Sequence, residues 1–382
     1  MRVKLKDIFD LQMGKTPSRS NLEYWNTTDY KWISIADLTK TSKYIFETKE
    51  YLSKSAIKDS GIKVIPANTV VMSFKLSIGK TAITKEDMYS NEAIMAFKDK
   101  HVINIIPEYI FYLFKYKNWE ECSNKAVMGK TLNKATLSEI EVEICSIEKQ
   151  RQIVNILDKI MSAVDGRKQE LQLLDELIKA RFVEMFGDPR SNPFGFEKKR
   201  LKDTCKVITG NTPSRAIEEY YGDYIEWIKT DNIVSGILNP TQATESLSEK
   251  GMNVGRTVEK DSILMACIAG SIASIGRVCI TDRTVAFNQQ INAVVPEQYN
   301  ILFLYVLFQM SKDYLVEDIN MALKGILSKS KLEEKEFIIP PMDLQEQFSD
   351  FVKQVDKSKV AVQKALDETQ ILFDSLMQKY FG

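Results

Sequence analysis

Three Gly-Lys-Thr triplets are the first feature of the sequence that could do chemistry, because this triplet ends the phosphate-binding Walker A loop. They occupy residues 14–16, 79–81 and 129–131. A Walker A loop also needs a glycine five residues before its Gly-Lys pair. Those positions hold Phe9, Phe74 and Asn124. The sequence therefore predicts no nucleotide site of this kind.

Other catalytic signatures are equally incomplete. An adenine methyltransferase would carry Asp or Asn, two prolines and an aromatic residue, but Asn192-Pro193-Phe194 has one proline and Ile339-Pro340-Pro341-Met342 has the wrong flanks. With His101 as the only histidine, a duplicated Ser-His or Cys-His site is excluded. Five cysteines without a Cys-x-x-Cys pair do not suggest zinc. We expect no catalytic residues, no metal and no cofactor on this chain.

Some loops do suit nucleic-acid contacts. Thr-Pro-Ser-Arg occurs twice, each time after Gly-Lys or Gly-Asn, and its proline constrains a loop whose hydroxyls and arginine can bind phosphate. Ser-Ile-Gly-Lys/Arg also occurs twice, and an Asn-Gln-Gln amide cluster can read adenine. The candidate DNA-binding residues are Lys15, Thr16, Ser18, Arg19, Lys80, Asn211, Thr212, Ser214, Arg215, Arg277, Asn288, Gln289 and Gln290.

Each motif also has a purely structural interpretation. The Thr-Pro-Ser-Arg loops can be turns that both copies inherited, and on their own the two interpretations weigh equally. Buried amides commonly satisfy backbone groups, and for the Asn-Gln-Gln cluster this interpretation is the favoured one. Asn91-Glu92-Ala93 stands where the other copy has Asn288-Gln289-Gln290, so the cluster itself is not duplicated.

The motifs recur because the chain contains a long internal repeat. Leu5-Lys6-Asp7 returns as Leu201-Lys202-Asp203, and Trp32-Ile33 returns as Trp227-Ile228. The offset stays between 195 and 197 up to the last match, where the chain stops. A constant offset over so many matches indicates a duplication, with each copy about half the chain.

Each copy begins with a region of mixed α/β character. Short β-rich runs at Tyr30–Ile35, Thr69–Phe74 and Ser262–Ile268 predict strands. Apolar runs at Pro107–Lys117 and Gln298–Met310 predict helices. We expect an α+β protein with two tandem mixed α/β domains, residues 1–146 and 188–341.

A proline-free segment follows each domain, at residues 147–187 and 342–382, and predicts a helix about 60 Å long. Its apolar residues recur at alternating steps of four and three, which is typical of a coiled coil. The alternative is a long amphipathic helix packed on a globular core. We call the apolar stripe along which the two helices would pack the seam. Its main apolar positions are Ile153, Leu157, Ile160, Leu171, Leu174, Ile178, Phe348, Val352, Val355, Val362, Leu366 and Phe373. The same spacing continues to Arg181 and Met185 in the first helix and to Leu376 and Tyr380 in the second.

Charge and hydropathy narrow the class of protein. The 382 residues include 52 basic and 52 acidic side chains, so a DNA-binding protein would need its basic groups gathered on one face. The N-terminus lacks the apolar segment of a secretory signal. The longest apolar stretch, near Ile301–Met310, is too short to span a bilayer. We expect a cytoplasmic protein.

Taken together, these motifs resemble a known family. A domain with Leu-x-Asp, Gly-x-Thr-Pro-Ser-Arg, an aromatic pair, Trp-Ile and Ser-Ile-Gly-Lys/Arg is similar to the target recognition domain of Type I restriction–modification specificity subunits. The helix starts at 148–153 and 343–348 fit the same family. The resemblance covers essentially the whole chain.

The resemblance implies a non-catalytic subunit that recognises a bipartite, gapped site in double-stranded DNA. The two helices would pack as an antiparallel coiled coil with a pseudo-two-fold axis and set the gap. Two modification subunits would bring S-adenosylmethionine and methylate adenine at N6. Restriction subunits with ATP and Mg²⁺ would cleave. The alternatives are the specificity subunit of a gapped-site system with a fused methyltransferase-nuclease partner, and a two-module adaptor that does not bind DNA.

Overall fold

The chain forms two compact units, each built from one globular domain and parts of both long helices. The computed structural model describes residues 1–75, 77–119, 124–126, 129–319 and 325–382, so Cys122 lies outside the described residues. Unit 1 comprises Met1–Gly166 and Leu366–Gly382. Unit 2 comprises Arg167–Ala365.

The larger sheet of unit 1 has five strands, in the order β2 (Phe9–Met13), β9 (Ile94–Asp99), β6 (Val70–Ser73), β7 (Thr81–Thr84) and β4 (Tyr44–Ile45). A smaller sheet has the order β5 (Glu50–Leu52), β3 (Tyr30–Ile33) and β8 (Tyr89–Ser90). Two further antiparallel pairs are β1 (Arg2–Lys4) with β12 (Glu141–Glu143), and β10 (Asn124–Ala126) with β11 (Gly129–Thr131). The short helices are α1 (Leu5–Ile8), α2 (Ile35–Lys40), α3 (Lys54–Ser60), α4 (Pro107–Tyr116) and α5 (Lys134–Glu139).

Unit 2 repeats this plan. Its first sheet has the order β14 (Cys205–Thr209), β23 (Ile291–Pro296), β19 (Ile263–Ala266) and β21 (Val278–Ile280). Its second has the order β15 (Tyr221–Gly222), β17 (Ser246–Leu247), β16 (Ile225–Ile228), β22 (Val285–Phe287) and β18 (Thr257–Val258). Further pairs are β13 (Lys198–Arg200) with β25 (Glu336–Ile338), and β20 (Ile268–Ala269) with β24 (Gly325–Ile326). The short helices are α7 (Glu249–Val254), α8 (Ile301–Met310), α9 (Lys312–Val316) and α10 (Lys329–Glu334).

The central strands are buried on both faces, and alternate residues enter two different cores. In β6, Val70 and Met72 pack in the core that contains α4, whereas Val71 packs in a second core on the other face. In β19 of unit 2, Ile263 and Met265 pack in the core that contains α8, and Leu264 packs in a second core on the other face. Because side chains alternate along a strand, each apolar run serves two layers. The duplicated α/β domain predicted from the sequence is confirmed.

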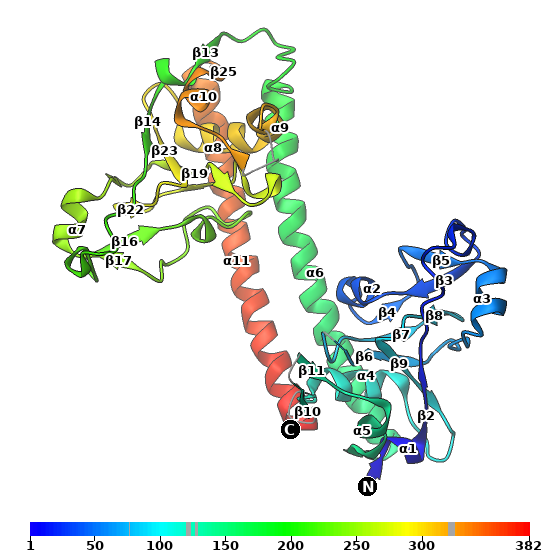
Figure 1. The fold of residues 1–382 in the computed structure, drawn as a ribbon. Coiled ribbons are helices and arrows are strands. Elements are labelled where there is room, and N and C mark those ends of the chain that lie inside the picture. The colour runs from blue at the N-terminus through cyan, green and yellow to red at the C-terminus, as the bar shows by residue number, and fades with distance from the viewer. Residues whose placement is uncertain (76, 120–123, 127–128, 320–324) are drawn as a thin grey trace. The chain divides into compact units, whose positions relative to one another are not determined.

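The long helices are α6 (Ile147–Phe186) and α11 (Met342–Phe381). Within unit 1, Ile153 and Leu157 near the start of α6 share a core with Phe373 and Met377 near the end of α11. Within unit 2 the end of α6 shares a core with Phe348 near the start of α11. Each unit thus pairs the start of one helix with the end of the other, so the helices run antiparallel (Figure 1).

Matched glutamines fix the start of each long helix to its domain. Gln150 is fully buried; its amide accepts from the backbone N–H of Ile106 at 3.0 Å and donates to the carbonyl of Asn104 at 3.1 Å. Gln345 in the other copy is also buried and accepts from the backbone N–H of Asn300 at 2.9 Å. These hydrogen bonds explain why a glutamine recurs at this place in the repeat.

The expected seam describes the middle of the helices better than their ends. Its twelve main residues are buried or half-buried. Towards the end of α6, however, Phe182 and Phe186 are fully buried and Met185, which the heptad placed at the seam, is only half-buried. Towards the end of α11, Met377 is buried where the heptad placed Leu376.

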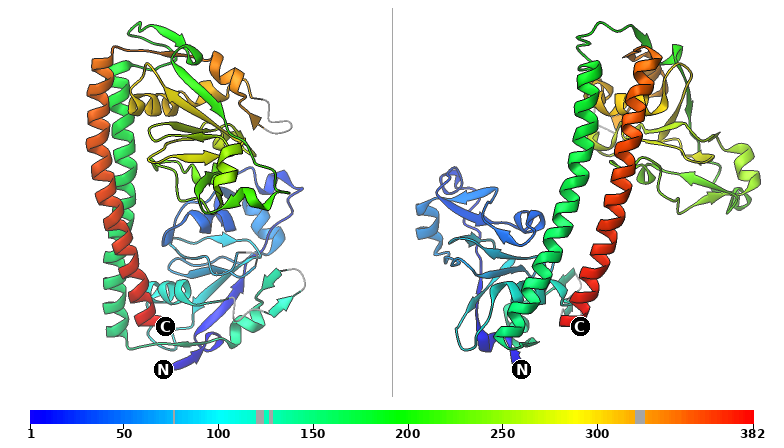
Figure 2. Two further views of the ribbon diagram at one scale, coloured as in Figure 1. Left: turned by 90° about the vertical axis from the view of Figure 1, so that its left-hand side faces the viewer. Right: turned by 180° about the vertical axis from the view of Figure 1, so that it is seen from behind.

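The cause of this shift is that each helix end packs against a globular domain as well as against the other helix. Phe182 lies 5.7 Å from Phe303 of α8 and 5.5 Å from Phe348 of α11, between ring centroids. A helix with 3.6 residues per turn presents residues four apart to such a flat neighbour. The views in Figure 2 show both helix ends beside the domains.

Candidate nucleic-acid interface

Two loops that are distant in sequence lie against each other in each unit. In unit 1 they are residues 14–19, after β2, and residues 91–93, after β8; we call them loop pair 1. The backbone N–H of Gly14 donates to the carbonyl of Ile94 at 3.1 Å. A Cβ on Gly14 would lie 2.2 Å from the carbonyl oxygen of Asn91. Only glycine permits this approach.

Loop pair 2, residues 210–215 and 288–290, has the same construction in unit 2. The backbone N–H of Gly210 donates to the carbonyl of Ile291 at 3.0 Å, and a Cβ on Gly210 would lie 2.2 Å from the carbonyl oxygen of Asn288. The Gly-x-Thr-Pro-Ser-Arg motif and the Asn motif recur together because each packs on the other.

A threonine hydroxyl joins the two loops of each pair, but its partner differs between the units. In unit 1, Thr16 donates to the carboxylate of Glu92, and this bond holds the pKa of Glu92 below its usual value. In unit 2, Thr212 donates to the amide oxygen of Gln289. The same scaffold therefore exposes a negative charge in one unit and a neutral amide in the other. Sequence reasoning missed Glu92, although it aligns with a candidate residue.

Arg19 and Arg215 lie in matching cages of aromatic rings and a carboxylate. The guanidinium of Arg19 is 3.7 Å from the ring centroid of Trp25 and pairs with Glu50 through both terminal nitrogens. Arg215 is 4.4 Å from the ring of Tyr221, and its Nη2 is 2.6 Å from Glu245.

These cages give both arginines a structural role. The sequence predicted that the arginines project towards phosphate, and each remains about half exposed. A phosphate would nevertheless have to compete with the carboxylate that each guanidinium already binds. Glu50 and Glu245 could have been found from the sequence, because they also match at the offset of 195.

Lys15 and Asn211 look unalike in the sequence but make equivalent contacts. The ammonium group of Lys15 donates to the carbonyl of Ser60, the last residue of α3, at 2.5 Å. The amide of Asn211 donates to the carbonyl of Val254, the last residue of α7, at 2.9 Å. Each side chain thus satisfies a free carbonyl at a helix C-terminus. Both hold their loops in place.

The amide cluster of unit 2 divides into structural and exposed members. Asn288 is buried, and its amide accepts from the backbone N–H of Gln290 at 3.1 Å and donates to the Gln290 side chain at 3.3 Å. Asn91 makes the matching bond to the backbone of Ala93 at 3.0 Å. Of the three amides, Gln289 alone is exposed.

The remaining candidates are placed as follows. Ser18 and Ser214 are exposed on loops, and the Ser18 hydroxyl bonds that of Ser20 at 2.8 Å. Lys80 donates to the hydroxyl of Thr39 at 2.5 Å. Arg277 donates to the carbonyls of Ser274 and Thr230 at 3.2 and 3.4 Å and lines a pocket to which loop pair 2 contributes no residue. The Arg277 side chain and the side chains of loop pair 2 therefore do not line the same pocket.

Three of the described cysteines are buried, and the histidine is exposed. Burial raises the pKa of the Cys205, Cys267 and Cys279 thiols to about 12, which keeps them protonated. His101 is exposed beside Asp99. The described part of the chain holds no cluster of three or more metal-ligating side chains. None of its helices has the length and apolar composition needed to cross a membrane.

The comparisons with known proteins agree with this architecture. The sequence profile of the family described as Type I restriction modification DNA specificity domain matches residues 1–176 and 193–369. The chain is 26% identical to the Type I restriction enzyme MjaIX specificity subunit of Methanocaldococcus jannaschii, over 98% of this chain and 91% of that protein. A shorter match, 33% identical, covers 38% of this chain and 35% of the HindI specificity subunit of Haemophilus influenzae.

Solved structures share the fold at low sequence identity. The S subunit of a Type I restriction–modification system from M. genitalium superposes with a TM-score of 0.58 at 13% identity, covering all of this chain and 96% of that one. Because the family profile matches both copies of the repeat and most of the chain, the protein belongs to the Type I restriction–modification DNA specificity family.

Proposed function

We propose that this chain is the DNA-recognition subunit of a Type I restriction–modification complex and that each unit reads one half of a gapped, asymmetric site. The observation that carries the proposal is the pair of duplicated loops. Both loop pairs have the same backbone arrangement, including the close contact between the glycine and the facing carbonyl. Glu92 in loop pair 1 nevertheless stands where loop pair 2 has Gln289. A carboxylate accepts from cytosine N4 and an amide suits adenine, so the two units are built to prefer different bases.

The long helices suit the role of spacer between the half-sites. Each has 40 residues and belongs partly to each unit, where it enters the hydrophobic core. A rigid connection between two weak recognition modules raises the effective concentration of the second module once the first is bound. The proposed gapped specificity therefore depends on the helices as much as on the loops.

Two modification subunits are the proposed partners for methylation of adenine at N6, with S-adenosylmethionine bound on those subunits. The duplication supplies two equivalent apolar positions for them. Leu177 on α6 and Leu372 on α11 match at the offset of 195, and about half of each side chain is exposed. Because the two positions are equivalent in the repeat, they suit two copies of one partner. Restriction subunits with ATP and Mg²⁺ would complete the cleaving complex.

Single-molecule methylation mapping tests this proposal. The host genome is compared with that of a strain that lacks this gene. We expect a bipartite adenine-methylated motif that disappears on deletion and returns when the gene is restored. Methylation that is unchanged by deletion, or a motif without a gap, would contradict the proposal. Absence of salt-dependent DNA binding by the purified methyltransferase complex would instead favour an adaptor.

A further inference from the structure

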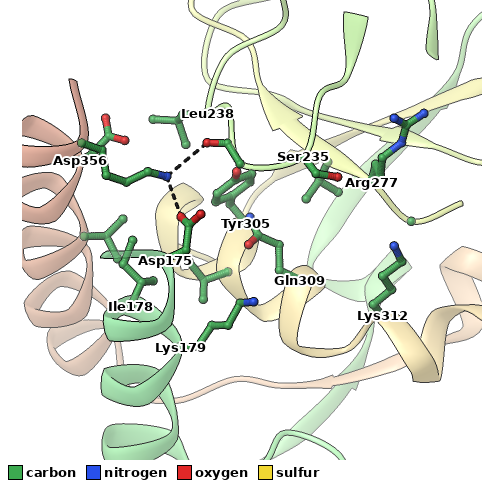
Figure 3. Close-up of a pocket in the computed structure, with 16 residues that line it drawn as sticks. Asp175, Ile178, Lys179, Ser235, Leu238, Arg277, Tyr305, Gln309, Lys312 and Asp356 are labelled. Carbon is green, nitrogen blue, oxygen red and sulfur yellow. Dashed lines mark hydrogen bonds and ion pairs between the residues drawn. The ribbon is translucent and has the colours of Figure 1, made fainter. Parts of the chain in front are cut away.

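A pocket of about 350 Å³ lies within unit 2, between the globular domain and the two long helices. Its walls come from α6, the loop at Ser235, the turn before β21, the helices α8 and α9, and α11. Figure 3 shows its charged side chains. We call the part lined by Lys179, Arg277 and Lys312 the basic notch.

The cations of the pocket fall into two groups. Lys359 is neutralised, because its ammonium group lies 2.7 Å from Asp175 and 3.2 Å from the carbonyl of Gly236. Asp356 lines the same region of the pocket. In Figure 3, Asp175 and Asp356 lie on the opposite side of the pocket from Arg277 and Lys312.

The three cations of the basic notch have no such neutralisation. Arg277 donates to the carbonyls already named, and Lys312 donates to the carbonyl of Ala273 at 2.6 Å. Among the described residues, Lys179, Arg277 and Lys312 form no ion pair with a carboxylate, although such pairs are frequent elsewhere in the chain. Lys179, Arg277 and Lys312 line one pocket, and cations that line a pocket without a counter-charge favour an anion there.

We propose that the basic notch binds a phosphodiester of the DNA backbone. Lysine and arginine bind phosphate oxygens, and the side chains of Ser235 and Gln309, which also line the pocket, add hydroxyl and amide donors. This inference rests on the proposed function and extends it, because Lys179 belongs to α6. The spacer helix then contacts DNA itself, and this contact is independent of base sequence.

The internal repeat gives independent support. The turn that carries Arg277 in unit 2 carries Lys80 in unit 1, and Lys80 also lacks a carboxylate partner among the described residues, since it donates to the hydroxyl of Thr39. The exposed residue that the loop threonine contacts differs between the units, Glu92 against Gln289, whereas the cation of the turn is retained. A ligand common to both half-sites explains this retention, and the DNA backbone is such a ligand.

Salt titration of DNA binding tests the basic notch. The double variant R277Q/K312Q of this chain is assembled with its modification subunits. Its DNA-binding constant is measured from 50 to 200 mM salt, on a duplex that contains the motif found by methylation mapping and on a duplex without it. The slope of log K against log salt is expected to become shallower by about 2, one for each cation that no longer binds a phosphate. Affinity at 50 mM salt falls about tenfold or more on both duplexes, and the ratio between the duplexes is unchanged.

Two further variants complete the experiment. K179Q changes an exposed side chain of α6, so it tests the site without disturbing the domain; it is expected to reduce the slope by about 1. K198Q is the matched control, because Lys198 is an exposed lysine on β13 that does not line the pocket, and its slope should equal that of the unmodified complex. An unchanged slope in both notch variants, or an equal reduction in the control, overturns the proposal.

A small anion is the competing ligand for the basic notch. Inorganic phosphate is therefore titrated calorimetrically into the unmodified complex and into the R277Q/K312Q complex. Millimolar binding that the variant loses, together with an unchanged DNA slope, would assign the site to a free anion and overturn the inference. If the unmodified complex shows no preference for any gapped motif, the proposed function fails instead, whatever the variants do.

Discussion

The ammonium group of Lys43 lies 2.5 Å from Oδ1 of Asp158, which joins the globular domain of unit 1 to α6. Lys43 is almost fully buried, and the hydroxyl of Tyr112 on α4 donates to the same carboxylate oxygen. The segment just before β4 and the helix α4 thus both contact one aspartate of α6. The contact fixes how the domain sits on its helix.

Removing Asp158 should destabilise unit 1. D158A leaves the buried ammonium group of Lys43 without a counter-charge, which costs about 3 kcal/mol for a buried pair and somewhat less here because Asp158 is partly exposed. The measurement is the free energy of unfolding by urea. The double variant K43M/D158A is the control and should recover most of the stability, because it leaves no unpaired charge. Equal destabilisation in both variants would contradict an electrostatic cause.

The glycines of the loop pairs should tolerate no side chain. G14A and G210A place a Cβ 2.2 Å from a carbonyl oxygen, so loop or strand must move, and we expect each to cost about 2 kcal/mol or more. G166A is the matched control: Gly166 lies in α6 with nothing within 4 Å of a built Cβ, and alanine there should stabilise by about 1 kcal/mol. Opposite signs in thermal unfolding confirm the close approach; equal signs refute it.

Exchange of one oxygen for one nitrogen should alter only one half of the recognised motif. E92Q gives unit 1 the amide that unit 2 has at Gln289, with the Thr16 hydroxyl still able to donate. We expect methylation mapping to show a relaxed or changed base in one half-site, with the other half unaltered. Q289E is the reciprocal variant and should affect the opposite half. A change in both halves, or in neither, would show that this position does not read bases.

Lengthening both helices should lengthen the gap. Seven residues inserted after Gly166 and seven after Ala365 preserve the phase of the apolar positions and add about 10 Å to each helix. With about 3.4 Å per base pair, the recognised gap should grow by about three base pairs. Methylation mapping of the variant checks this value. An insertion in one helix alone is the control and should abolish methylation, since the helices then no longer match.

Three cysteines should be protected from alkylation in the folded protein. Burial raises the pKa of Cys205, Cys267 and Cys279 to about 12. Their reactive thiolate is therefore scarce at pH 8 and forms only as the pH rises towards 12. Because the thiols of the unfolded chain already ionise near pH 9, the free energy of unfolding falls as the pH rises above 9. Mass spectrometry after iodoacetamide treatment at pH 8 should find these three unmodified, with full modification in urea as the control. Labelling of Cys267 in the native protein would contradict the burial of the residue that follows β19.

Much of the fold could be predicted from the sequence because its signals are local. The start of α4 at Pro107 agrees with the expected helix, whereas α8 begins at Ile301, after the N-cap Asn300, rather than at Gln298. The helix expected over 147–187 extends from Ile147 to Phe186. Such boundaries depend on caps, prolines and apolar spacing, all of which lie within a few residues of the element they define.

The site was harder to predict because its contacts join residues far apart in the chain. Asn288 is buried by its own loop and Arg19 is held by Glu50, 31 residues away, so both are occupied in ways that a motif does not reveal. The alignment of the two copies could have identified the carboxylates that hold the arginines, since Glu50 and Glu245 match at the same offset as the other repeated residues. Residue type alone could not tell a positioning arginine from a free one.

The sequence by itself determined the duplication, the two long helices and the lack of complete catalytic motifs, because repeats, periodicity and motif spacing are properties of the linear chain. Only the tertiary structure decided which charges are neutralised and which face of a helix end is buried. Phe182 is buried in place of the neighbouring seam position, Arg181, because α8 packs against this end of α6. Among the described residues Lys359 has a carboxylate partner and Lys312 has none, because the folded chain brings Asp175 within 2.7 Å of Lys359 alone.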